Sequence, residues 1–288
     1  MGIDIGQALR EGASRTTGKN GLVLAIVFAG IALLTTVLAN SFFVELVELF
    51  LELIQSTSPE ELGVSQQEYE QQVQLLSELR SSLTGPTVIG LPISVAFTGI
   101  VATAFISEAI SVILVRMFSR DDLDTISRDL IIDGILMATL NGFVGKIIVW
   151  GLIIATFPLL ILPAVFVAVA FYFMRQEIAL NNKNFIQAMA DSWRITKGSR
   201  IEVFLIGAVL VLISQLEPAA SAIINSITTI GGAVAGALVG GVLAVFGAAV
   251  ATRAYVQLDG AGDTVESDSD EEFEDPYDAA LGPDDLSR

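Results

Sequence analysis

Two charged side chains lie inside long apolar runs of the sequence: Glu108 in the run 90–115 and Lys146 in the run 142–174. Charges at membrane depth are costly, so such residues are functional candidates by default. A carboxylate and an ammonium group in this setting could pair with each other across a helical bundle or line an ion path. Alternatively, both lie near the cytoplasmic ends of their runs, and their side chains extend to the interface.

Other chemistry has little support in the residue types present. The sequence contains no Cys and no His, which removes thiolate nucleophiles, disulfides, imidazole bases and the usual zinc and copper ligands. No glycine-rich phosphate loop follows a strand, and no carboxylate pair occurs at metal-ligand spacing on a helix. We therefore expect no catalytic residue, no cofactor and no metal site. Ser, Lys and the carboxylates keep an intramembrane enzyme as a third hypothesis.

The elements that would position Glu108 and Lys146 are membrane spans. Hydrophobic residues make up 53% of the 288-residue chain, and they gather in long runs rather than at helical or strand periods. A run of about 20 apolar residues crosses a hydrocarbon core of roughly 30 Å as a helix. The sequence predicts an all-α, polytopic transmembrane bundle in residues 1–258, with spans at about 21–40, 91–115, 142–158, 160–176, 201–217 and 230–252.

The basic residues predict the orientation of these spans, because Lys and Arg are retained on the cytoplasmic side of short loops. With both termini inside, all but two of the fifteen basic residues are cytoplasmic; Arg80 lies outside and Lys146 lies within a span. We therefore expect a multi-pass protein of the cell membrane with both termini in the cytoplasm.

The formal net charge of −17 is concentrated in two segments. Eight Glu stand against Arg80 in residues 41–85, and twelve acidic residues stand against Arg288 in residues 259–288. This excess argues against nucleic acid as a partner, since phosphates would be repelled. Four Lys beside eleven Arg in an acidic chain are typical of proteins that function in high salt, which predicts a haloarchaeal source.

Three kinds of segment lie outside the spans. In residues 41–85 we expect two amphipathic outer helices that form a small cap, with Pro59 in the first turn of the second; a solvated acidic loop is the alternative. Residues 259–288 are too charged and too poor in apolar residues to fold, so we expect a disordered acidic tail, either inert or holding a partner-binding motif. Cytoplasmic surface helices are expected at about 4–17, 122–140 and 184–197.

An internal match at an offset of 180 residues relates the first and last surface helices. Gln7, Ala8, Thr16 and Gly18 correspond to Gln187, Ala188, Thr196 and Gly198. Chance is the alternative at this length. If the match is a true repeat, the chain consists of three modules that start near residues 1, 121 and 181, each a surface helix followed by a two-span hairpin.

The third module contains a short polar element made of Ser192, Trp193, Thr196, Lys197, Gly198 and Arg200. It resembles the recurring Ser-Trp-x-x-Thr-Lys-Gly-x-Arg pattern in membrane domains attached to some bacterial glycerophosphodiester phosphodiesterases, and in uncharacterised haloarchaeal multi-pass membrane proteins. The similarity spans most of residues 1–255 and implies a multi-span domain without an established activity of its own. In that family, the phosphodiesterase chemistry belongs to a separate barrel with His and metal-binding carboxylates. This chain has neither such a barrel nor any His, so the phosphodiesterase activity is not expected here.

The helix that carries this Ser-Trp element has one apolar face, formed by Phe185, Ile186, Met189 and Trp193. We expect the helix to lie along the cytoplasmic membrane surface, with Trp193 in lipid or packed against the underside of the bundle. Gly198 stands where a helix C-cap belongs, and Ser199 with Glu202 predicts a capping box that starts the next span.

The last span carries small residues every four positions: Gly232, Gly236, Gly240, Ala244 and Ala248. Such a glycine zipper lets another helix approach closely. The partner helix lies either within the monomer or across a dimer seam, and the oligomeric state stays open.

The leading functional hypothesis is a non-enzymatic protein with a structural or accessory role in the archaeal cell envelope. Its partners would be membrane lipids, together with a protein bound through the acidic tail or the small-residue face. The rival hypothesis is a small-solute transporter or channel that uses Glu108 and Lys146. A water-filled cavity reaching Glu108 would favour transport, whereas a solid apolar bundle would favour the structural role.

Overall fold

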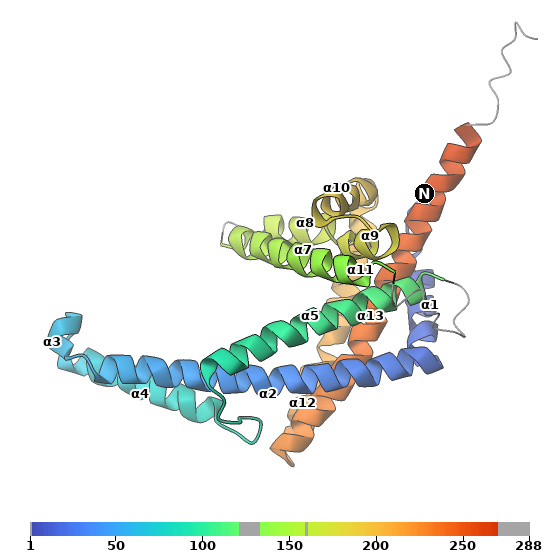
Figure 1. Ribbon diagram of the computed structural model, residues 1–288. Coiled ribbons are helices and arrows are strands. Elements are labelled where there is room, and N and C mark those ends of the chain that lie inside the picture. Colours follow the sequence, from blue (N-terminus) through green and yellow to red (C-terminus); the bar gives the residue numbers. More distant parts are fainter. Residues whose placement is uncertain (1, 121–132, 159–160, 270–288) are drawn as a thin grey trace, which may run out of the picture.

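The computed structural model of the chain describes residues 2–120, 133–158 and 161–269 (Figure 1). Regular structure in these residues is helical, without strands. Six helical segments are long and apolar enough to cross a membrane: Lys19–Gln55, Ile93–Phe118, Ile135–Thr156, Ile161–Asn181, Arg200–Asn225 and Thr229–Asp259. The predicted all-α polytopic bundle with six spans is therefore confirmed.

The helices converge at one end of the molecule and diverge at the other (Figure 1). The convergent end, as we call it, contains three short helices: α1 (Ile5–Thr17), α9 (Met174–Asn181) and α10 (Phe185–Thr196). The far ends are separate from one another and carry α3 (Pro59–Leu62) with α4 (Gln66–Leu83) at one extreme and α12 (Leu216–Asn225) at another. The described chain is thus tied together mainly at the convergent end.

The first span does not stop at the expected boundary. Helix α2 (Lys19–Gln55) has 37 residues without a break, and at 1.5 Å per residue its length of about 55 Å exceeds a hydrocarbon core of about 30 Å. The first of the two predicted outer helices is therefore an extension of the span. The reason is local: residues 42–54 are rich in Glu and Leu, which favour helix, and contain no Pro or Gly.

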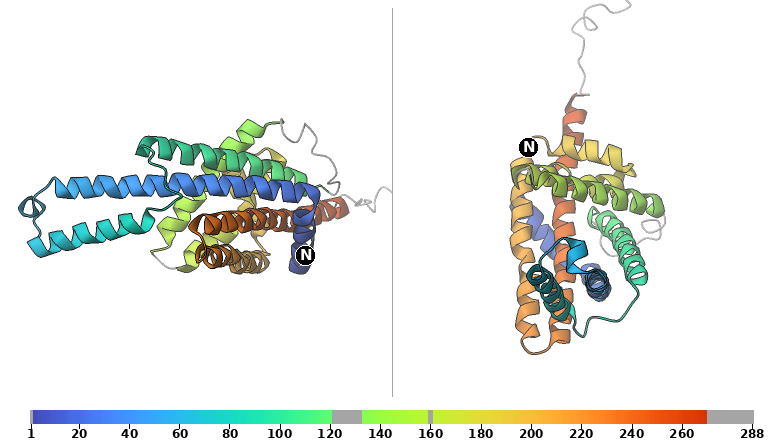
Figure 2. Two further views of the ribbon diagram at one scale, coloured as in Figure 1. Left: turned by 90° about the horizontal axis from the view of Figure 1, so that it is seen from below. Right: turned by 90° about the vertical axis from the view of Figure 1, so that its left-hand side faces the viewer.

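The second outer helix folds back along this extension, and Figure 2 shows α2 and α4 side by side. Pro59 lies in the first turn of α3 as predicted, and Gly63, with φ of +66°, separates α3 from α4. The Tyr69 hydroxyl donates to the Ile54 carbonyl at 3.3 Å, and Arg80 Nη2 lies 3.2 Å from Glu48 Oε2. The segment is a helical hairpin rather than a solvated loop.

Other predicted boundaries are also wrong, and the fifth span continues to Asn225 instead of ending at about residue 217. Helix α7 (Ile135–Thr156) already includes the last residues of the surface helix expected at 122–140; the part at 122–132 lies outside the described residues. Helix α13 (Thr229–Ser269) continues through the first part of the tail expected to be disordered, and residues 270–288 lie outside the described residues. Propagation of an existing helix costs little per residue, so a span can extend into a polar segment that would not nucleate a helix alone.

Two spans are interrupted. The fifth consists of α11 (Arg200–Ser214) and α12, separated at Gln215. Pro218 explains this break, because proline lacks the N–H that would bond the carbonyl four residues earlier, on Ser214. The fourth consists of α8 (Ile161–Ala170) and α9, separated at 171–173, where no proline is present.

The first and third modules share structural details that the 180-residue offset predicts. Asp4 and Asn184 cap α1 and α10, and their side chains accept from the backbone N–H of Gln7 at 2.8 Å and of Gln187 at 3.0 Å. The hydroxyls of the matched threonines donate to the carbonyl four residues earlier in both helices. Positions 8, 12 and 16 are buried, as are positions 188, 192 and 196. These correspondences support a true repeat of the surface helix.

Candidate functional site

The charged residues predicted in the spans belong to one cluster. Glu108 of α5 (Ile93–Phe118) is only 1% exposed, and its carboxylate accepts from Arg175 Nε at 2.8 Å and Arg175 Nη2 at 3.0 Å. Lys146 Nζ of α7 lies 3.8 Å from Glu108 Oε2. Glu108 therefore has a bidentate partner on α9 that the sequence analysis did not single out. Arg175 was counted among the cytoplasmic charges, and no local pattern pointed to Glu108.

The backbone of α7 makes room for this cluster. A Cβ at Gly142 would lie 2.8 Å from Glu108 Oε1, so only glycine permits this position of the carboxylate. Asn141 and Gly145 of α7 contact the start of α10, since Phe185 N donates to Asn141 Oδ1 at 3.2 Å and a Cβ at Gly145 would lie 3.3 Å from Phe185 Cβ. The cluster is thus close to the convergent end rather than midway along the spans.

The contact at 3.8 Å supports pairing of Lys146 with Glu108. The Lys146 side chain is 45% exposed and that of Arg175 is 32% exposed, so both cations reach the bundle surface while they face the same buried carboxylate. Extension of Lys146 toward the membrane interface stays a prediction.

A second polar cluster joins α9, α10 and α13. The buried carboxylate of Glu177 accepts from Lys183 Nζ at 2.7 Å and from the Tyr255 hydroxyl at 3.1 Å. Lys183 also pairs with Asp191 at 2.8 Å. Burial acts to lower the pKa of Lys183, but its hydrogen bonds to Asp191 and Glu177 outweigh burial and raise that pKa. The hydrogen bond from Lys183 lowers the pKa of Asp191. Both groups are therefore held in their charged forms.

Arginines complete the connections at the convergent end. Arg116 donates to the Ala179 carbonyl at 2.8 Å, the Asp133 carbonyl at 2.6 Å and Asn182 Oδ1 at 3.0 Å. Arg15 of α1 donates to the Arg120 carbonyl, and Arg253 of α13 pairs with Glu11. Cations suit the carbonyls of Ala179 and Arg120, because carbonyl groups at the C-terminal ends of helices lack intrahelical partners. Basic residues that predict orientation thus also bond one helix end to another.

The Ser-Trp element is bound to the interrupted fourth span. Ser192 Oγ donates to the Ala170 carbonyl at 3.0 Å and accepts from Phe173 N at 3.1 Å. Thr196 Oγ1 lies 3.4 Å from the same carbonyl. A break in a span exposes backbone groups that lipid cannot satisfy. These hydroxyls replace hydrogen bonds that the break at 171–173 removes.

Trp193 and Arg200 of the element pack against aromatic rings of the interrupted span. Trp193 is 42% exposed, and its ring centroid lies 5.2 Å from that of Phe166 and 5.9 Å from that of Phe171. The Arg200 guanidinium is 4.8 Å from the Trp193 ring and 4.7 Å from the Phe166 ring, within cation–π range. Trp193 therefore packs on the bundle with one side still open.

The end of α10 departs in one respect from the prediction. Gly198 has φ of +115°, which agrees with its expected capping role, and Lys197 is exposed. The Ser199–Glu202 capping box is wrong, because the Ser199 side chain makes no capping hydrogen bond. Its backbone, at φ −123° and ψ 23°, is outside the extended region that an N-cap residue adopts.

A known protein family matches most of the chain. A family model described as a domain of unknown function, DUF7847, matches residues 3–258. The chain belongs to this family. The match covers the six candidate spans together with α1 and α10, so the DUF7847 domain is the membrane bundle itself. No curated protein and no solved structure matches the chain.

The role of Ser192 in the DUF7847 domain is testable by removing one hydroxyl. Ser192→Ala leaves the Phe173 N–H buried without its partner, and we expect the free energy of unfolding to fall by about 1–3 kcal/mol. Ser226→Ala is the matched control, since the Ser226 hydroxyl bonds only within its own turn, to the Ile223 carbonyl. Thermal unfolding in lipid nanodiscs measures both; equal midpoints would show that Ser192 does not stabilise the break.

The glycine zipper of the DUF7847 domain packs within the monomer. A Cβ at Gly232 would lie 2.7 Å from Asn225 Cβ, one at Gly236 3.2 Å from Ser221 Cβ, and one at Gly240 3.0 Å from Glu217 Cδ. All three neighbours belong to α12, which runs antiparallel to α13 across the preceding turn (Figure 1). Of the two alternatives left by the sequence, the structure supports the intramolecular partner for this face.

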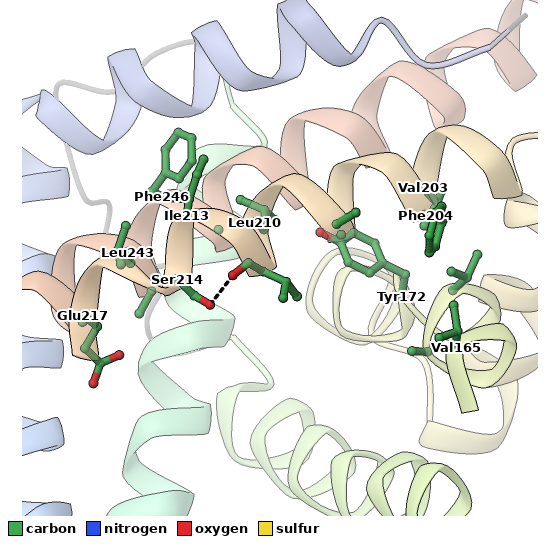
Figure 3. A pocket seen from close by; sticks show the side chains of 18 residues that line it. Val165, Tyr172, Val203, Phe204, Leu210, Ile213, Ser214, Glu217, Leu243 and Phe246 are labelled. Atoms are coloured by element: carbon green, nitrogen blue, oxygen red, sulfur yellow. Dashed lines mark hydrogen bonds between the residues drawn. The ribbon is translucent and has the colours of Figure 1, made fainter. Parts of the chain in front are cut away.

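An apolar groove of about 720 Å³ lies between α8, α11, α12 and α13 (Figure 3). Its walls are mainly aliphatic and aromatic, and its polar side chains are Tyr172 toward one end and Ser214 with Glu217 toward the other. The sequence analysis did not predict this groove. Gly240 and Ala244 of the predicted zipper line it, but Gly207 and Gly247 belong to separate helices and lie outside that four-residue spacing.

Proposed function

We propose that the protein is a non-enzymatic integral membrane protein with a structural or accessory role in the archaeal cell envelope. The observation that carries the proposal is the buried ion pair of Glu108. This residue is 1% exposed, and its two carboxylate oxygens accept hydrogen bonds from Nε and Nη2 of Arg175. A charge engaged in this way connects α5 to α9. The Glu177 and Arg116 contacts connect further helix ends in the same manner.

The rival proposal of a transporter or channel needs a carboxylate that water and a solute can reach. The 720 Å³ groove lies on α8, α11, α12 and α13 and includes neither Glu108 nor Lys146. The backbone of α7 at Gly142 packs against one carboxylate oxygen of Glu108, and Arg175 donates hydrogen bonds to both oxygens. These contacts favour the structural role over an ion path through Glu108.

A flux assay separates these two proposals. In proteoliposomes with an imposed proton or sodium gradient, we expect wild type and Glu108→Gln to show the same leak as protein-free liposomes, because Glu108 serves packing. Proton or sodium flux through wild type that Glu108→Gln abolishes would contradict the structural role.

We further propose that the Ser-Trp element marks a scaffold shared with the membrane domains attached to glycerophosphodiester phosphodiesterases. Its support is that Ser192, Thr196, Trp193 and Arg200 all contact the same interrupted span, Arg200 through the Phe166 ring. Under this proposal the shared element stabilises a fold, and no phosphodiesterase activity is inferred for this chain.

We propose a location in the cell membrane with the convergent end in the cytoplasm, because Arg15, Arg116 and Arg253 gather there. The chain has no native Cys, so single substitutions test the orientation. Ser82→Cys on exposed α4 should react with an impermeant thiol reagent in intact cells, whereas Ser14→Cys on exposed α1 should react only after permeabilisation. The reverse pattern would contradict this topology.

A further inference from the structure

We propose that the apolar groove binds the hydrocarbon chain of a membrane amphiphile whose cationic amine headgroup pairs with Glu217. The groove is lined by α8 from Val165 to Val169 and Tyr172 just after it, by α11 from Val203 to Ser214, by Glu217 of α12 and by α13 from Gly240 to Gly247 (Figure 3). The proposal concerns the lipid-facing side of the bundle and is independent of the role of Glu108.

The groove is hollow because α11 and α13 each have a glycine, without a side chain, on the side that faces it. A Cβ added at Gly207 would have no heavy atom within 4 Å, and one at Gly247 would only touch Leu210 Cδ1 at 4.0 Å. Elsewhere on α13, by contrast, glycines contact other helices closely, as Gly241 does against Ala25. Gly207 and Gly247 therefore do not serve close helix packing, and the space beside them is available to a ligand.

The dimensions suit one lipid chain. The groove extends along α11 and α12 from Val203 to Glu217, which at 1.5 Å per residue is about 21 Å. One leaflet of the hydrocarbon core is about 15 Å thick, half of roughly 30 Å. A chain from one leaflet can therefore lie along the groove with its headgroup at the Glu217 end.

The carboxylate of Glu217, at one end of the groove, determines which headgroup can bind there. Glu217 is exposed, has no ion-pair partner among the described residues, and lies with its carboxylate against Gly240. It stands 17 positions beyond Arg200 at the convergent end, about 25 Å along the helix axis and hence near the opposite membrane interface. The groove lining contains no Lys or Arg. A carboxylate beside an apolar groove favours an amphiphile with a positive charge and hydrogen-bond donors.

Spin-labelled probes test the proposal on the full chain in phosphatidylcholine nanodiscs. The probes are a long-chain alkylamine and the alkylcarboxylate of equal chain length, each with a nitroxide on the chain. We expect the alkylamine to show a saturable, motionally restricted component in the electron paramagnetic resonance spectrum. Glu217→Gln should weaken alkylamine binding about tenfold, since it removes a charged hydrogen-bond acceptor.

A substitution that fills the groove with a larger side chain gives a second test of the proposal. Gly207→Leu should abolish the restricted component, whereas Gly151→Leu should not, although a Cβ at either glycine meets nothing within 4 Å. Gly151 lies on α7, away from the groove. Unchanged thermal unfolding of Gly207→Leu establishes that it folds. Equal restriction of the two probes, or full alkylamine binding by Gly207→Leu, would overturn the proposal.

Discussion

Replacing Gly241 with alanine should severely destabilise the folded bundle. A Cβ at this position would lie 2.3 Å from the Ala25 carbonyl oxygen and 2.7 Å from Ala29 N. Both neighbours are backbone atoms of α2, so the clash is relieved only if α2 and α13 separate. Overpacking a core typically costs about 1–3 kcal/mol and occasionally more. Because the obstacle is backbone rather than side chain, we expect a loss above that range, measured as the thermal midpoint in nanodiscs.

Gly247→Ala is the matched control for this substitution. It lies on the same helix, and the nearest atom to its Cβ would be 4.0 Å away. Alanine is favoured over glycine in a helix interior by about 1 kcal/mol, so this variant should be at least as stable as wild type. Equal midpoints for Gly241→Ala and Gly247→Ala would show that α2 and α13 do not cross at Gly241.

Glu108→Gln should be the most damaging substitution of a charged residue. It leaves Arg175 and Lys146 facing each other without the carboxylate that both approach. Removing one partner of a buried ion pair costs about 3–5 kcal/mol. The partial exposure of both cations reduces this cost, so we expect a decrease of about 3 kcal/mol in the free energy of unfolding, at the lower end of that range.

Glu48→Gln is the control for loss of a carboxylate. Glu48 pairs with Arg80 on the exposed surface of the α2–α4 hairpin, and exposed pairs contribute at most about 1 kcal/mol. Thermal unfolding of both variants in one nanodisc preparation gives the comparison. A Glu108→Gln variant no less stable than Glu48→Gln would contradict a structural role for the buried carboxylate.

The spans were predictable from sequence because the signal lies within each segment. Long apolar runs define all six, and proline at position 218 accounts for the break in the fifth. The break at 171–173 was not predictable, since no proline marks it and its backbone groups are satisfied by Ser192, which is distant in sequence. The Ser-Trp pattern located that residue without revealing its partner.

Sequence periodicity predicted the close contact of α13 with α12 but not the contact of α13 with α2. The four-residue spacing of Gly232, Gly236 and Gly240 indicated a helix partner, which is α12. Gly241 lies outside that pattern, yet its approach to α2 is closer. Likewise, Glu108 and Lys146 were evident as charges in apolar runs, but the partner Arg175 is a contact between distant segments. Such contacts depend on tertiary packing and leave no local pattern.

The structural role of the buried charges is tested most directly by a double-mutant cycle on Glu108→Gln and Arg175→Gln, with the free energy of unfolding measured for wild type, both single variants and the double variant. Residues that share an ion pair show coupling energies of about 0.5–3 kcal/mol, whereas independent sites add within about 0.3–0.5 kcal/mol. The bidentate contact predicts coupling of at least about 1 kcal/mol, with the double variant more stable than additivity requires. Additive effects would contradict the claim that Glu108 ties α5 to α9.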